Sequence, residues 1–153
     1  MIISAGILPY RYRAGVLQVF LVHPGGPLWK NRDLGSWGIA KGMVEQGEDL
    51  QQAARREFLE ETGVTIGEAT IALAPLRQKS GKIVHAWAVE QDIDAVRIQS
   101  NTFAMEWPPR SGVHQAFPEV DRAQWFTTTE ALERMLPGQR AFLADLEYRL
   151  VHG

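Results

Sequence analysis

The segment Asp49–Thr62 constrains the fold of this chain most, because it is its clearest helix and carries its own start and stop signals. Asp49 with Gln52 three residues later matches a capping box, in which two side chains satisfy free backbone groups at a helix start. Gly63 stands where a C-terminal cap belongs, and alanine and leucine fill the interior. The sequence therefore predicts a helix over 49–62.

Three glutamates share the apolar side of this predicted helix, at a step of about 100° per residue. Like charges four residues apart repel by a few tenths of a kcal/mol, and acids in the last turn oppose the helix dipole by about 0.3–1 kcal/mol each. A bound divalent cation would reverse that balance, because Mg²⁺ prefers carboxylates, water and phosphate oxygens. A solvated charged face is the alternative, but it would lie opposite the apolar residues. The shared face holds Glu57, Glu60 and Glu61 with Leu50, Ala53, Ala54 and Phe58.

Composition narrows the chemistry further. The chain of 153 residues has no cysteine, which excludes disulfides, thiolate catalysis, zinc fingers and iron–sulfur sites, so any metal is held by oxygen or imidazole. Its length indicates one domain over 1–153. The net charge of −2 argues against nucleic acid as the main partner. No leader pattern or apolar run of 18 residues is present, so we expect no membrane segment and a cytoplasmic protein.

Short apolar runs separated by turn residues predict a mixture of strands and helices along the rest of the chain. The stretches His23–Ser36 and Ser100–Pro118 lack any period and read as long loops, which are usually functional when they occur in a compact domain. The predicted strands are Ile2–Arg13 and Val16–His23, joined by a turn at Ala14-Gly15, then Trp37–Lys41, Ala69–Gln78, Lys82–Gln91 and Val120–Phe126. The further predicted helices are Thr128–Met135 and Gln139–Val151, interrupted at Pro137-Gly138.

The glutamate helix lies within a longer motif. The motif reads Gly42, five residues, Glu48, seven residues, Arg56-Glu57-Phe58, any residue, Glu60-Glu61, any residue, Gly63-Val64. It resembles the complete Nudix box of the nucleoside-diphosphate-linked-moiety hydrolases, with Phe58 standing where an aliphatic residue is more usual. The resemblance implies an α/β Nudix fold, a mixed β-sheet sandwiched between α-helices, over nearly the whole chain.

The resemblance also implies roles for the box residues. Glu57, Glu60 and Glu61 would bind Mg²⁺ or Mn²⁺. Arg56 would anchor or orient these carboxylates, and Glu48 would stiffen the loop or reach the metals through water. The implied reaction is attack of water on a phosphorus atom of a P–O–P bridge.

Relatives often supply one more carboxylate from a later loop, some half-dozen residues before a strand that carries a tryptophan. Glu119, six residues before Trp125, fits that place and is our candidate catalytic residue and metal ligand; its alternative reading is an ordinary acid at the start of a strand. Glu106 is the second choice. The general base stays open between Glu57, Glu60 and the loop acid.

The two irregular stretches and the approach to the box hold groups suited to a nucleotide, since aromatic rings stack on bases and cations pair with phosphates. Each has a structural alternative: Trp37 and Phe103 would be core residues and Lys30 merely exposed. His85 shares a face with apolar residues and reads as packed. The candidate substrate-binding residues are Lys41, Trp29, Trp107 and Arg110.

Outside the box, the sequence resembles the diadenosine tetraphosphate hydrolases most, although this similarity is loose. It rests on Ser4-Ala5-Gly6, Ala40-Lys41-Gly42, Gly47-Glu48-Asp49 and His114-Gln115-Ala116. This likeness ranks a dinucleoside polyphosphate first and a nucleoside triphosphate second. The rivals are a Nudix-fold module that senses a nucleotide without turnover and an RNA 5′-end pyrophosphohydrolase. The expected partner is a small-molecule nucleotide, with a homodimer suggested by family habit.

Overall fold

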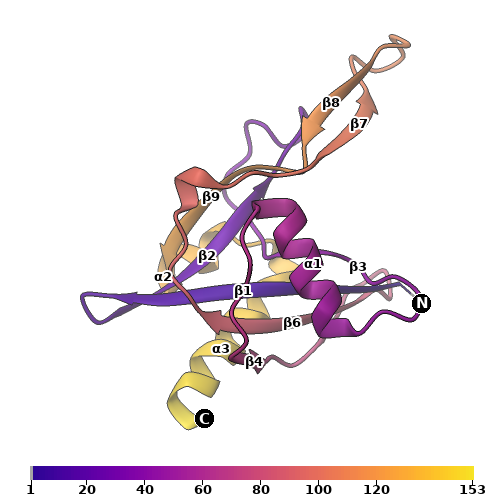
Figure 1. Ribbon diagram of the computed structural model, residues 1–153. Helices are drawn as coiled ribbons and strands as arrows, with labels where there is room; N and C mark the ends of the chain where they lie inside the picture. The colour runs from indigo at the N-terminus through magenta and orange to yellow at the C-terminus, as the bar shows by residue number, and fades with distance from the viewer. Residues whose placement is uncertain (1) are drawn as a thin grey trace.

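The computed structural model describes residues 2–153, which form a seven-stranded sheet, a separate two-stranded hairpin and three α-helices (Figure 1). Two short 3₁₀ turns complete the chain, at Ala95–Arg97 and Pro137–Gln139. The strands are β1 (Ile3–Arg13), β2 (Val16–Pro24), β3 (Ala40–Met43), β4 (Thr70–Ala72), β5 (Leu76–Arg77), β6 (Ile83–Glu90), β7 (Thr102–Glu106), β8 (His114–Pro118) and β9 (Val120–Thr127). The helices are α1 (Leu50–Thr62), α2 (Thr128–Arg134) and α3 (Arg140–His152).

Strand β1 is the centre of the sheet, whose order is β4-β6-β1-β2-β9. It runs parallel to β6 and antiparallel to its other partners, so the predicted mixed sheet is confirmed. The other edge of β1 is shared: residues 4–7 pair with β3, whereas residues 10–13 pair with β2. Gln18 and Val19 of β2 pair with both β1 and β9, and beyond Val19 the strand leaves β1 while it stays paired with β9. The sheet is therefore forked along this edge.

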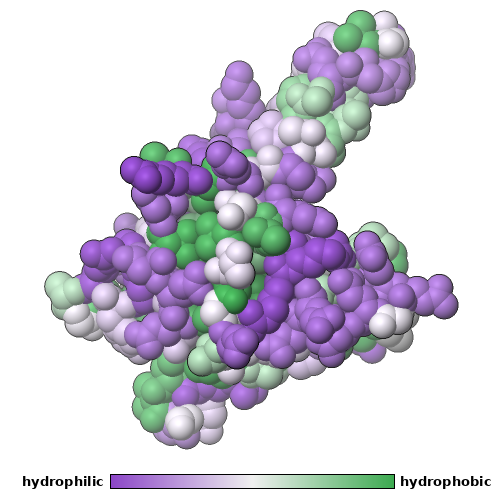
Figure 2. Space-filling model, in the orientation of Figure 1, coloured by the Kyte–Doolittle hydropathy of each residue, from purple (hydrophilic) through white to green (hydrophobic). Residues whose placement is uncertain are grey.

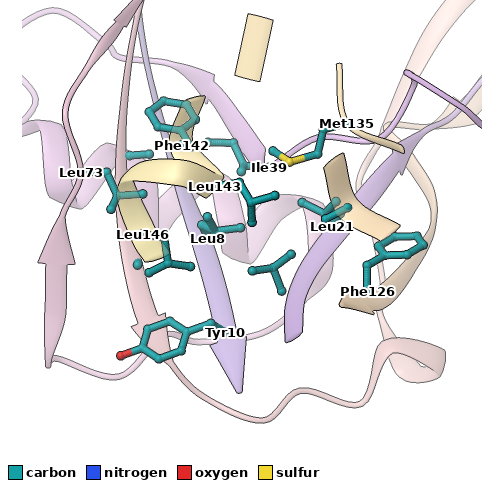
Figure 3. Packing of buried hydrophobic residues seen from close by; sticks show 14 of the residues in the cluster. Leu8, Tyr10, Leu21, Ile39, Leu73, Phe126, Met135, Phe142, Leu143 and Leu146 are labelled. Carbon is teal, nitrogen blue, oxygen red and sulfur yellow. The ribbon is translucent and has the colours of Figure 1, made fainter. Parts of the chain in front are cut away.

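Helices cover both faces of the sheet, as expected for the α/β arrangement. Alternate residues of β1 point to opposite faces, so Leu8 belongs to one apolar cluster and Ile7 to the other. Figure 3 shows the first cluster, in which Phe142, Leu143 and Leu146 of α3 pack against the sheet. The second cluster is closed by α1 through Ala53, Ala54 and Phe58.

Helix α1 begins and ends where the sequence predicts. The Asp49 carboxylate accepts a hydrogen bond from the Gln52 backbone N–H at 3.1 Å. Gly63 has a φ of 77°, in the left-handed region that glycine favours, and its N–H donates to the Leu59 carbonyl at 2.8 Å. Because both signals are local, this helix needed no knowledge of its tertiary partners to be recognised.

The predicted strand Ala69–Gln78 is wrong as a single element, because it is divided into β4 and β5. Pro75 lies between them and has no backbone N–H to give to a neighbouring strand. The adjacent Ala74 N–H donates to the Asp145 carboxylate of α3 at 2.8 Å, so it is withdrawn from the sheet. The strand Lys82–Gln91, in contrast, is confirmed as β6.

The predicted irregular stretch Ser100–Pro118 is also wrong in part, because β7 and β8 pair as an antiparallel hairpin from Thr102 opposite Pro118 to Glu106 opposite His114. We call residues 102–118 the arm. It projects well beyond the body of the molecule and carries both hydrophilic and hydrophobic surface (Figures 1 and 2). No helix within residues 2–153 has the length and apolar character needed to cross a membrane.

Candidate active site

Arg56 ties the loop before α1 to the acidic face of the helix. Its guanidinium donates to both carboxylate oxygens of Glu48, at 2.8 and 3.0 Å, and to the Met43 carbonyl at 3.1 Å. It also donates to Glu57 at 3.0 Å and to Glu60 at 3.3 Å. The hydrogen bond from Arg56 lowers the pKa of Glu48, so that carboxylate stays ionised. Arg56 thus contacts Glu57 and Glu60, two of the three carboxylates that it was predicted to orient, and in the part of the chain that the structure describes it makes no ion pair with the third, Glu61.

Gly42 of β3 leaves room for the carboxylate of Glu57. A Cβ atom at position 42 would overlap that carboxylate, so Glu57 can keep this position only with glycine there. Only 15% of the Glu57 side chain is exposed, and burial raises its pKa. The glycine that opens the motif is therefore explained by a contact with a glutamate fifteen residues later.

Glu61 is the most strongly perturbed carboxyl group of the site. Its Oε2 atom is buried and has no hydrogen-bond partner. Burial raises the pKa of Glu61 to about 8, and the negative charges of Glu57 and Glu119 act in the same direction, while Lys41 opposes them. An unpaired carboxylate oxygen beside two further carboxylates is a costly arrangement without a cation.

A cleft of about 190 Å³ lies over this acidic group. Glu61 from α1, Lys41 from β3 and Glu119 just before β9 all line it, with apolar walls from the sheet and the α2–α3 connection. The backbone of Glu119 is fixed on both sides, since its N–H donates to Asn101 at 2.9 Å and its carbonyl accepts from Gly25 at 3.0 Å. The cleft thus gathers residues that lie 78 positions apart in the chain.

The donor set of the site fits a hard divalent cation. Its acids are carboxylates that repel one another, and one of their oxygens is buried without a partner. Among residues 2–153, no three His, Asp or Glu side chains are arranged around one point as metal ligands. Arg56 forms ion pairs with Glu57 and Glu60, and these ion pairs partly explain why the carboxylates do not converge on one point.

The predicted substrate-binding residues fall into two groups. Lys41 lines the cleft, and burial together with the neighbouring Lys82 ammonium lowers its pKa to about 8. Trp29 lies in the loop after β2, half-buried, with the Arg32 guanidinium 5.4 Å from its ring centre. Trp107 and Arg110, however, lie at the tip of the arm and do not line the cleft.

The two alternative late carboxylates are also separated. Glu119 lines the cleft, whereas Glu106 ends β7 on the arm, where its carboxylate accepts from the Arg110 N–H at 2.8 Å. The structure therefore brings Glu119, and not Glu106, to the acidic residues of α1.

Several aromatic and basic residues have the structural roles that were weighed as alternatives. Trp37 is buried in the core against Phe126, with ring centres 5.0 Å apart. Lys30 is exposed. His85 is half-buried and stacks on Trp87 at 6.5 Å. Phe103, by contrast, lies outside both core clusters, half-buried on the arm.

Lys82 is a residue that sequence reasoning missed. It precedes β6, and its ammonium lies beside that of Lys41. Lys82 adjoins β6 and Lys41 lies on β3. These two strands pair with opposite edges of β1, so the two side chains approach each other across β1. Parallel pairing between distant segments leaves no local signal, so nothing near Lys82 in the sequence marks it.

A protein-family model described as NUDIX domain matches residues 3–146. Among curated proteins, the chain is 33% identical over 101 residues to an octanoyltransferase of Myxococcus xanthus, a match covering 66% of this chain and 25% of that protein. It is 48% identical over 52 residues to an RNA pyrophosphohydrolase of Caulobacter vibrioides, covering 31% of this chain and 30% of that protein. The chain thus spans about a quarter to a third of the length of these relatives.

Among solved structures, a binary complex of the Ap4A hydrolase of Caenorhabditis elegans superimposes with a TM-score of 0.67. The alignment covers all of both chains at 21% sequence identity. At that identity the likeness concerns the fold, and it extends from the first strand to the last helix.

Proposed function

The chain belongs to the NUDIX domain family, and from that premise we propose that it hydrolyses a pyrophosphate linkage in a nucleoside diphosphate derivative with the help of Mg²⁺ or Mn²⁺. The observation that carries the proposal is the cleft, which brings together Glu61 of α1, Glu119 before β9 and Lys41 of β3. Its acids suit a cation and its ammonium suits a phosphate oxygen.

Four carboxylates would hold the metal: Glu57, Glu60 and Glu61 of α1, and Glu119. The bound cation would neutralise the phosphate charge and activate a water molecule for attack. Arg56 would keep the ligands on α1 in place through its contacts with Glu57 and Glu60, while Glu48 holds Arg56 itself. These side chains are carried by a capped helix, which suits a site that works mainly by positioning.

The chemical step balances without any further reactant. The oxygen of water forms a bond to one phosphorus atom while the bridging P–O bond breaks, and the leaving phosphate departs with the electron pair of that bond. A carboxylate takes the proton of the attacking water. We assign this role to Glu119 or Glu57. Both carboxylates lie close enough to Glu61 to raise its pKa, so both lie beside the proposed metal site. Lys41 would pair with the phosphate chain and orient it.

The substrate that we rank first is a dinucleoside polyphosphate, followed by a nucleoside triphosphate. Support comes from the full-length fold similarity to an Ap4A hydrolase. Trp29 lines a smaller cavity with Gly25, whose neighbour Pro24 lines the cleft, and would meet the first nucleoside. Trp107 and Arg110 would contact a substrate that extends along the arm, as the second nucleoside of a dinucleotide would.

Two other functions stay in view. Hydrolysis of RNA 5′ ends is favoured by the similarity to an RNA pyrophosphohydrolase over 52 residues, although the net charge of −2 offers little attraction for a polyanion. A module that senses a nucleotide without turnover is disfavoured because every acid of the motif is present.

Product identification by chromatography tests the proposal. The protein would be incubated with Mg²⁺ and a panel of diadenosine polyphosphates, nucleoside triphosphates, ADP-ribose and 5′-triphosphorylated RNA, with Glu61→Gln as the control. We expect metal-dependent cleavage of a P–O–P bond in one class, lost in Glu61→Gln. Binding of a nucleotide without any cleavage would instead support the sensing module.

A further inference from the structure

A second, smaller cavity lies between the arm and the loop that follows β2. Its volume is about 130 Å³, which is close to the 150 Å³ of an apolar cavity known to hold a benzene ring. Apart from the indole N–H of Trp29 and the weakly accepting thioether of Met105, none of its side chains carries a hydrogen-bonding group. The cavity is lined by Gly25, Gly26, Leu28, Trp29, Phe103 and Met105.

Glycines bring the two walls of this cavity together. Gly26 has a φ of 97°, and a Cβ atom there would lie 3.0 Å from the edge of the Phe103 ring. A Cβ atom on Gly25 would overlap the Pro118 carbonyl at the base of the arm. A side chain at position 25 would push the loop and the arm apart, and one at position 26 would strain the backbone and displace the Phe103 ring, so the shape of the cavity depends on both glycines.

The aromatic walls are supported from behind. The ring of Phe103 packs against Phe117 across the hairpin, with ring centres 6.1 Å apart. Arg32 lies over Trp29 with its guanidinium 5.4 Å from the ring centre. Two aromatic rings that are each held by a neighbour form a preformed stacking surface.

This cavity adjoins the acidic cleft. Pro24 lines the cleft and the next residue, Gly25, lines the cavity. Gly25 also donates its N–H to the carbonyl of Glu119, which itself lines the cleft. A substrate whose phosphates bind at the carboxylates would therefore have this apolar cavity next to it, because adjacent residues of the polypeptide line the two sites.

We propose that this cavity receives the base of the substrate by stacking and leaves its hydrogen-bonding edge unread, so that the enzyme selects the phosphate chain and tolerates all four bases. The proposal rests on the function proposed above and extends it to specificity. Every base offers a π-face to Trp29 and Phe103, whereas rejection of a base by a large factor needs buried polar groups that a wrong base would leave unpaired. Adenine, guanine, cytosine and uracil therefore bind with similar affinity.

Equilibrium binding tests this without requiring turnover. The ligands are methylene-bridged diphosphates of the four ribonucleosides, which cannot be hydrolysed at the bridge, and methylenediphosphonate, which has the same bridge and no base. We expect dissociation constants within about tenfold for the four bases. Phe103→Ala and Trp29→Ala each weaken nucleotide binding by about 5- to 100-fold and leave methylenediphosphonate unchanged.

One further variant controls for folding. Tyr148→Ala removes an exposed ring from α3, far along the chain from the cavity, and leaves all affinities unchanged.

Three results would overturn the proposal: no nucleotide binding by the parent chain, discrimination between bases well above about tenfold, or equal losses for methylenediphosphonate and nucleotides in Phe103→Ala. A chain that stacks nucleotides in this way but cleaves none in the product assay would refute hydrolysis and leave the base cavity standing.

Discussion

The acidic cleft and the arm differ in how the chain supports them. The cleft is built on a capped helix that packs on the central strand, and its arginine makes ion pairs with three carboxylates. The arm is a two-stranded hairpin outside both core clusters, with exposed residues along most of its length. The chemistry thus lies on the rigid part, and the surface that would contact the nucleosides lies on the part with fewest neighbours.

The sharpest way to break this comparison is to remove an acid from the cleft. Glu61→Gln and Glu60→Gln should each lower kcat by more than about 100-fold, because each removes charge where the cation would bind. Steady-state kinetics with circular dichroism would check that the fold is retained. Near-normal turnover in either variant would refute the proposed metal site.

A paired substitution compares the cleft with the arm directly. Glu119→Gln should lower kcat by about 10- to 100-fold, because Glu119 lines the cleft as ligand or base. Glu106→Gln, on the arm, should leave kcat unchanged. The opposite ranking of the two rates would move the late carboxylate to the arm.

A methyl group tests how closely the cleft is packed. Gly42→Ala should lower kcat by about tenfold, because the new Cβ would displace the Glu57 carboxylate. Gly67→Ala is the matched control, since a Cβ there would meet only the Gln91 side chain at 3.5 Å. Equal rates for the two alanine variants would contradict the contact.

The charge of the cleft predicts a pH dependence of stability in the metal-free chain. The pKa of Glu61 is raised from 4.5 to about 8 on folding, so between these pH values the folded chain binds more protons than the unfolded chain. The contribution of Glu61 to the free energy of unfolding should therefore fall as pH rises through this window, by at most about 1.4 kcal/mol per pH unit, and level off above pH 8.

Urea denaturation at pH 5, 6, 7 and 8 with a chelator would measure this, and the slope should be shallower in Glu61→Gln. Lys41 stays charged across most of the window, because its lowered pKa is also about 8, so it adds little slope below pH 7. Parallel profiles for the parent chain and the variant would contradict the assignment.

The smallest effect is expected at the tip of the arm. Trp107→Ala should raise KM for a dinucleoside polyphosphate by about three- to fivefold through loss of one stacking contact, and leave KM for a nucleoside triphosphate unchanged. A loss of thermal stability without any change in KM would give Trp107 a structural role instead.

Local signals account for what could be predicted from the sequence. Asp49, Gly63 and the spacing of the glutamates define α1, because capping and helical periodicity act within one segment. The β7–β8 hairpin was missed because Pro108, Pro109 and Pro118 and the short length of the alternating apolar runs left no clear strand pattern. The two strands pair with each other across the arm. Lys82 was missed because parallel pairing joins segments with no shared local pattern. The positions of Trp107 and Arg110 away from the cleft follow from the same hairpin.

The fork in the sheet sets the width of the cleft, because its two prongs carry different acids of the site. Glu61 is carried by α1, which packs on the prong formed by β1, β3 and β6, whereas Glu119 is joined to the prong formed by β2 and β9. The prongs share β-ladder pairing near the Ala14–Gly15 turn, at residues 10–13 of β1. The prongs are also tied across the open side, because Val22 of β2 and Gly38 before β3 exchange two backbone hydrogen bonds, at 2.9 and 3.0 Å, and Phe20 of β2 packs on Phe58 of α1. The distance between the two carboxylates is therefore braced at both ends of the fork, so the site is held in place before any phosphate chain arrives.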